Sequence, residues 1–224
     1  MATGLDARRV RLNLRVIEGT LRTVQREFGE IQRALGAPRD PLSDPVIDNM
    51  LAGYALVDAL LADGTDVLAM GNLKHLLELN TMVLCGTSAE RRAAYATHIA
   101  ATERRFYDDR EAGIEDLMEW HARHADEPVW LRATGLYLRV LATPQLFIEG
   151  NHRTGALIMS YVLARQGEPP FVLSVDNAVP YFQVSASVRE ITKGSAATFF
   201  RHLALRRRVT EVLAAHADRR HLLP

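Results

Sequence analysis

The sequence has little cysteine, no excess charge of either sign and no long apolar run. Cys85 is the one cysteine among 224 residues, so no intrachain disulfide can form and a reducing compartment is expected. Basic and acidic residues number 27 each, which gives no reason to expect nucleic acid or a membrane surface as a partner. No segment reaches the roughly 18 apolar residues of a membrane span, and residues 1–14 lack the apolar core of a signal peptide. These absences indicate a cytoplasmic protein.

What the sequence does contain is helical periodicity over most of its length. Apolar residues between positions 10 and 35 recur at spacings of three and four, which predicts one stripe of a long helix that ends near Gly36. The stripe consists of Val10, Leu14, Ile17, Leu21, Val24, Phe28, Ile31 and Leu35. Similar patterns predict helices over about 46–61, 73–83, 91–106, 114–121, 129–141, 156–163, 177–192 and 196–217. Helices throughout and hardly a strand predict an all-α fold.

The predicted long helix makes residues 1–37 a unit of their own. The proline-containing loop 38–45 separates it from the rest of the chain, which is short enough to form a single domain. The apolar stripe of this helix must be covered, and packing on the remainder of the chain is the favoured explanation. A heptad seam with a second copy, which would give a homodimer, is the alternative.

One stretch, residues 147–153, has residue types suited to chemistry. It lies between two predicted helices and reads Phe-Ile-Glu-Gly-Asn-His-Arg. The first turn of a helix offers unpaired backbone N–H groups that bind phosphate, here those of Gly150, Asn151 and His152. Arg153 adds a permanent charge suited to phosphate, and Glu149 is a hard oxygen ligand of the kind that Mg²⁺ prefers. Each residue alone is more often a turn, cap or surface residue, and only their succession predicts a phosphate site.

The segment 145–156, Gln-Leu-Phe-Ile-Glu-Gly-Asn-His-Arg-Thr-Gly-Ala, resembles the signature of Fic-domain proteins, which have the Fido fold. That signature is H-x-F-x-[DE]-G-N-[GK]-R-x-x-R. The resemblance covers about residues 46–208 and leaves 209–224 as the end of the last helix and a tail. It implies a helical Fic-like bundle and, in active members, transfer of AMP, another nucleotidyl group or a phosphoryl group to a hydroxyl of a target protein.

The resemblance also implies roles for the residues of the motif. Glu149 would bind Mg²⁺ together with a nucleotide such as ATP, the segment 150–152 would form the anion hole, and Arg153 would hold a phosphate. Phe147 would anchor the loop in the core. The expected partners are a nucleotide or another phosphorylated small molecule, and a target protein.

The family also has a β-hairpin flap that aligns its target, and here the flap would fall within residues 87–108. The residues themselves favour a different structure, because Thr87 and Glu90 have the spacing of a helix capping box. A short hairpin and a helix both remain open for this segment.

Three positions depart from the signature and decide how much activity carries over. Gln145 replaces the histidine that removes the proton from the attacking hydroxyl, and an amide is no base at neutral pH. Ala156 replaces the second arginine, which would hold the outer phosphates of a nucleotide. His152 replaces glycine or lysine; it is either a surface side chain or a substitute proton acceptor.

Two classes of function follow from these departures. The first is a Fic-type transferase in which a group other than Gln145, with His152 as the candidate, moves the proton. The second is a catalytically silent pseudo-Fic protein that binds a nucleotide or another protein. Residues 23–27 also resemble the start of the family's inhibitory helix, which would carry Glu27 as the inhibitory glutamate.

Overall fold

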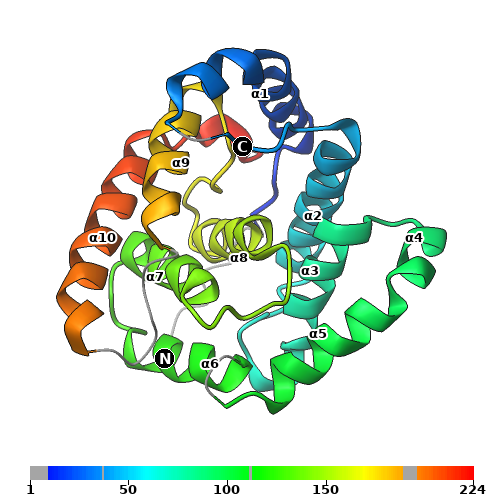
Figure 1. The fold of residues 1–224 in the computed structure, drawn as a ribbon, viewed down its shortest axis with the longest axis vertical. Helices are drawn as coiled ribbons and strands as arrows, with labels where there is room; N and C mark the ends of the chain where they lie inside the picture. Colours follow the sequence, from blue (N-terminus) through cyan, green and yellow to red (C-terminus); the bar gives the residue numbers. More distant parts are fainter. Residues whose placement is uncertain (1–9, 37, 111–112, 189–195) are drawn as a thin grey trace, which may run out of the picture.

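The computed structural model describes residues 10–36, 38–110, 113–188 and 196–224, and Figure 1 shows them as a bundle of helices. The α-helices are α1 Leu14–Ala34, α2 Asp44–Ala62, α3 Lys74–Cys85, α4 Ala89–Ala94, α5 Ala96–Asp108, α6 Ile114–Arg123, α7 Val129–Leu141, α8 Asn151–Arg165, α9 Val175–Val188 and α10 Ala196–Ala215. Two short 3₁₀ helices span Met70–Asn72 and Arg219–His221. No strand occurs among the described residues, so the predicted all-α fold class is confirmed.

Helix α8 is the central element of the bundle. Nearly every one of its residues is buried, as expected for a helix that is apolar on all sides. It packs against α7, α3 and α2, and Figure 1 shows it surrounded by these helices and α9. Close approach of α7 depends on Gly155, because a Cβ there would lie 3.0 Å from Cδ2 of Tyr137. The core therefore fixes the position of the predicted phosphate site at the start of α8.

The predicted apolar stripe of α1 is confirmed and is covered by the chain itself. Its buried members are Ile17, Leu21, Val24, Phe28 and Ile31. They face α9, α2 and the 3₁₀ helix 219–221, so the alternative of a seam with a second copy loses its basis. The helix begins later than the pattern suggests, because the side chain of Asn13 caps it by accepting from the N–H of Val16.

Contrary to the expectation that no segment is long and apolar enough to cross a membrane, helix α2 meets these criteria, as the one such helix among the described residues. Half of its 18-residue apolar window is buried inside the protein, where it packs on α3, α8 and α1. The core helix of a soluble protein meets the same criteria, so this is weak evidence for a membrane.

Residues 87–108 form helices, so the β-hairpin alternative for this segment is wrong. Figure 1 shows α4 and α5 beside α3 as a helical pair, with a break at Tyr95. The cap is Ser88, whose side chain accepts from the N–H of Arg91, and not Thr87 as the capping-box spacing predicts. The predicted end of α9, at Gly194, lies outside the described residues.

Candidate phosphate site at the start of helix α8

The motif forms a junction between a loop and helix α8, as predicted. Gly150 is the N-cap of α8 and has a φ of 78°, a conformation that favours glycine. Asn80 on α3 holds the turn from outside, because its Nδ2 donates to the carbonyl of Glu149 at 2.9 Å and to Oγ1 of Thr154 at 3.0 Å. A Cβ on Gly150 would lie 3.1 Å from this Nδ2. The position thus requires glycine both for its backbone angle and for the space beside Asn80.

Asn151 closes the loop with its side chain. Its Oδ1 accepts from the N–H of Phe147 at 2.9 Å, and its Nδ2 donates to the carbonyl of Phe147 at 2.8 Å. The ring of Phe147 is fully buried and stacks on Phe106 with 5.9 Å between the centroids. The anchoring role that the family resemblance implies for Phe147 agrees with this burial. Asn151 therefore shapes the loop with its side chain, while its backbone N–H belongs to the first turn of α8.

Gln145, at the position of the family's histidine, takes part in the same network. Its Nε2 donates to the carbonyl of Leu141 at 3.3 Å, and its Oε1 accepts from Nδ2 of Asn151 at 3.2 Å. Arg105 on α5 donates to its backbone carbonyl at 2.6 Å. The glutamine thus ties the loop to α7 and α5, and an amide in these contacts gives the site no proton acceptor.

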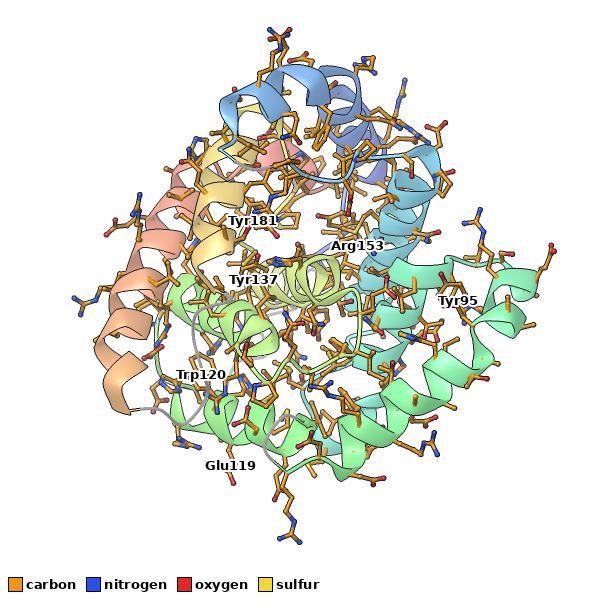
Figure 2. All side chains as sticks on the ribbon, viewed as in Figure 1. Tyr95, Glu119, Trp120, Tyr137, Arg153 and Tyr181 are labelled. Carbon is orange, nitrogen blue, oxygen red and sulfur yellow. The ribbon has the colours of Figure 1, made fainter. Side chains whose placement is uncertain are left out.

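Arg153 and Glu149 provide the opposite charges of the site. Arg153 is half-buried, and its Nη1 donates to the carbonyl of Val83 at 3.1 Å. Burial lowers the pKa of the Arg153 guanidinium, and the negative charge of Glu149 opposes that shift. A guanidinium still keeps its proton under such conditions. Arg153 thus remains a cation beside the first turn of α8 (Figure 2).

Glu149 is exposed, and among the described residues no group of three or more His, Cys, Asp or Glu side chains could hold a metal ion. Mg²⁺ in nucleotide sites is usually held by one or two carboxylates together with phosphates and water. A single exposed carboxylate beside Arg153 and the helix start fits that mode of binding. Glu149 would hold the ion there, and the ion would neutralise phosphate charge when bound.

His152 lies in a chain of hydroxyl groups. Its Nδ1 is 3.2 Å from the hydroxyl of Tyr137 on α7, which donates to the hydroxyl of Tyr181 on α9 at 2.9 Å. Figure 2 shows the two tyrosines reaching toward each other between these helices. Burial raises the pKa of Tyr181 to about 12 and that of Tyr137 well above its ordinary value. Both tyrosines are therefore protonated at neutral pH and serve as hydrogen-bond partners, not bases.

Sequence reasoning did not predict three residues of this site. Asn80 lies 69 positions from Glu149, and Arg105 and Tyr137 also come from other helices. The one available signal was a polar residue, Asn80, at a buried position of an apolar helix. Glu27, the candidate inhibitory glutamate, is exposed, and the structure gives it no contact with Arg153.

Comparison with known proteins gives sequence relatives but no family model that matches the chain. Over 94 residues, 41% of its length, the chain is 30% identical to protein adenylyltransferase fic-1 of Caenorhabditis briggsae. It is 29% identical over 94 residues to protein adenylyltransferase fic-1 of Caenorhabditis elegans. The match spans 18% of each of these relatives. The crystal structure of a Fic-domain-containing signaling protein from Bacteroides thetaiotaomicron aligns with 91% of this chain and 88% of its own, at a TM-score of 0.47 and 15% identity.

Proposed function

We propose that this chain is a Fic-type protein, a proposal supported by its motif and by the similarity to the two adenylyltransferases, and that it binds a phosphorylated small molecule at the start of α8, with a Mg²⁺-nucleotide as the expected ligand. The observation that carries the proposal is the turn at Gly150, whose φ of 78° directs the chain into the first turn of α8. The backbone N–H groups of residues 151–153 lack helical partners there and are suited to phosphate. Arg153 and Glu149 support the proposal with a cation and a Mg²⁺ ligand.

Transfer of a nucleotidyl or phosphoryl group to a protein hydroxyl is the reaction that this site would catalyse. The hydroxyl oxygen attacks phosphorus, the bond to the leaving phosphate breaks, and the hydroxyl proton needs an acceptor. Gln145 cannot serve, so we assign that role to His152. When Tyr137 donates to Tyr181, it accepts from Nδ1–H of His152, and the neutral ring then carries its lone pair on Nε2. Nε2 is buried in this structure, so the imidazole would have to turn toward the attacking hydroxyl to accept its proton.

A catalytically silent binding module is the second candidate. It is favoured by the hydrogen bonds of Gln145, which join Leu141 and Asn151 in place of a catalytic base. Both candidates require the phosphate site and differ only in turnover. Binding and transfer therefore need separate experiments.

Calorimetry with Mg²⁺-ATP, Mg²⁺-CTP and AMP tests the binding. Arg153→Ala should weaken the binding of each ligand that the natural chain binds by at least tenfold, because a charge-assisted contact to phosphate is lost (roughly 1.5–3 kcal/mol). Arg26→Ala, which removes an exposed arginine of α1, is the matched control and should leave affinity unchanged. Binding of no nucleotide by the natural chain would contradict the proposal.

Transfer assays with labelled nucleotides separate the two candidates. Gln145→His should raise the rate about 10²- to 10⁴-fold if the silent module is correct, since a positioned base contributes about that much. If the natural chain is already active and His152→Ala abolishes its activity, the transferase with a substitute base is correct. Gln145→Asn keeps an amide without basicity and serves as the control for altered packing.

A further inference from the structure

A cavity of about 300 Å³ lies beside Arg153, enclosed by α1, α2, α8, α9 and the segment 39–42. His152, Arg153 and Ala156 form part of its wall. Ala156 occupies the position where the family signature has its second arginine, so a small apolar side chain leaves space where a long cation would stand. The cavity and the proposed phosphate site are therefore adjoining parts of one site.

The wall of this cavity is mainly apolar and aromatic. Three of its rings form a continuous group, with 4.8 Å between the centroids of Phe171 and Tyr181 and 5.5 Å between those of Tyr181 and Phe182. The hydroxyl of Tyr54 donates to the carbonyl of Phe171 at 2.6 Å, so this polar group of the wall is satisfied within the protein. The aliphatic part of the wall consists of Leu21, Leu42, Val46, Ile47, Met50 and Leu173. A flat apolar ring finds more partners here than a charged group does.

Arg39, Asp40 and Arg153 are the charged residues among those that line the cavity. Arg39 donates to the carbonyl of Phe182 at 3.1 Å and lies over its ring at 5.3 Å, and Arg153 likewise donates to a carbonyl, that of Val83, at 3.1 Å. Asp40, exposed beside Arg39, carries the opposite charge. Arg153 differs from Arg39 in lying in the first turn of α8, beside backbone N–H groups without helical partners, so it is the cation placed to hold a phosphate there. Additional phosphates placed in the apolar part would lose their hydration without a paired cation, which is costly.

We infer that the cavity holds the aromatic ring of an organic phosphate, a nucleoside or aryl phosphate, whose phosphate group lies at the start of α8. This inference rests on the proposed function, because it uses the phosphate site as the anchor. The volume suits a single ring system, since pockets for small molecules begin at about 300 Å³. The outer phosphates of a nucleotide lie outside this cavity. The small side chain of Ala156 thus leaves room for the ring next to Arg153, and in this way it determines the orientation of the ligand.

Calorimetry of the full chain with four simple probes tests the inference. The probes are inorganic phosphate, phenyl phosphate, octyl phosphate and inorganic triphosphate, each in the presence of Mg²⁺. We expect phenyl phosphate to bind at least tenfold more tightly than inorganic phosphate and more tightly than octyl phosphate. Equal affinity for phenyl and inorganic phosphate would overturn the inference while leaving the phosphate site intact. A higher affinity than that of inorganic phosphate for triphosphate alone would also overturn the inference, because it would place outer phosphates in the cavity.

Two variants locate the ring in the cavity. Leu42→Trp places a larger side chain at the half-buried edge of the wall, and Phe182→Leu removes a ring while retaining an apolar side chain. In both variants the ratio of the affinity for phenyl phosphate to the affinity for inorganic phosphate should fall toward one. The affinity for inorganic phosphate itself should remain unchanged. An unchanged preference in the folded Phe182→Leu variant would overturn the inference. Failure of the natural chain to bind any of the four probes would instead contradict the proposed function together with this inference.

Discussion

Gly150 is the residue on which the geometry of the proposed phosphate site depends most. Its φ of 78° disfavours any L side chain by about 1–2 kcal/mol, and a Cβ would also lie 3.3 Å from Leu84 and Val83. Gly150→Ala should therefore lower the free energy of unfolding by more than the backbone term alone. It should also weaken phosphate binding, because the first turn of α8 must move. Urea denaturation and calorimetry measure the two effects.

Gly167 provides the matched control for this prediction. It has nearly the same φ, 77°, but no atom lies within 4 Å of a Cβ built there. Gly167→Ala should lower the free energy of unfolding by about 1–2 kcal/mol, the effect of the backbone angle alone. It should leave the affinity for phosphate unchanged. Equal losses in the two variants, with affinity retained in both, would show that the space beside Asn80 does not matter.

Asn151 illustrates how one side chain can hold a loop. Asn151→Ala leaves the buried N–H and carbonyl of Phe147 without the partners at 2.9 and 2.8 Å, and an unsatisfied buried group costs about 1–3 kcal/mol. We expect the free energy of unfolding to fall by about 2–4 kcal/mol. Asn72→Ala, which removes one bond from a half-buried side chain to the carbonyl of Asp66, should cost about 1 kcal/mol. Similar urea midpoints for the two variants would contradict this account.

The sequence predicted the residues of the motif better than their surroundings. Their succession along the chain placed Glu149, Gly150 and Arg153 at a helix start, which the structure has at Asn151, while their roles in binding remain a prediction. The contacts of Asn80 and Tyr137 could not be predicted, since they depend on how α3 and α7 pack against α8. The side chain of Asn151 was also unexpected, because spacing predicts a cap or an N–H donor but not a two-way bond to Phe147.

At the scale of elements, two predictions differ for the segment 87–108: one comes from its residues and the other from the family resemblance. The residues favoured helix and the resemblance a hairpin, and the structure contains α4 and α5. Local signals were sufficient here because a capped helix needs no distant partner. The exact cap was not predictable, since Thr87 and Ser88 are both good capping residues and neighbours in the chain.

Substitution of the two candidate caps distinguishes them. Ser88→Ala should destabilise the first turn of α4 by about 1 kcal/mol, the usual effect of losing an N-cap oxygen. Thr87→Ala should change the stability of this first turn by less than about 0.5 kcal/mol, as for ordinary surface substitutions. Hydrogen exchange of the backbone amides in residues 91–95 measures both. Faster exchange in Thr87→Ala but not in Ser88→Ala would place the cap one residue earlier.

At the scale of the whole molecule, the two ends of the described chain are joined. Leu12 and Leu222 form an antiparallel bridge, the N–H of Asn13 donates to the carbonyl of His221 at 2.8 Å, and Nε2 of His221 lies 3.1 Å from Oγ1 of Thr20 on α1. His221 is buried. The imidazole thus lies at the point where the end of the chain is fastened to α1.

This position makes stability depend on pH. Burial lowers the pKa of His221, Asp218 opposes the shift and Arg220 adds to it; burial also lowers the pKa of His121. Both histidines bind protons more weakly when folded than in the unfolded chain, where the pKa is about 6.5. Their contribution is fully present above about pH 6.5 and is lost as the pH falls below it. Urea midpoints should therefore decrease between pH 7.5 and 5.

His221→Gln should reduce this decrease, and the remainder should come from His121. His216→Gln, a change at an exposed position of the described chain, is the control and should preserve the pH dependence of the natural chain. Identical curves for His221→Gln and the natural chain between pH 7.5 and 5 would exclude His221 as the cause.

The pairing of the two ends also sets an order of events during synthesis. Thr20 and His221 are 201 positions apart, and such distant contacts form late because the intervening chain must first be ordered. A chain synthesised from its N-terminus exposes the apolar stripe of α1 until α9 and residues 219–221 have left the ribosome. The face of α1 that packs against α9 and residues 219–221 is therefore uncovered until those segments emerge, and this face is the surface of α1 on which chaperones should act.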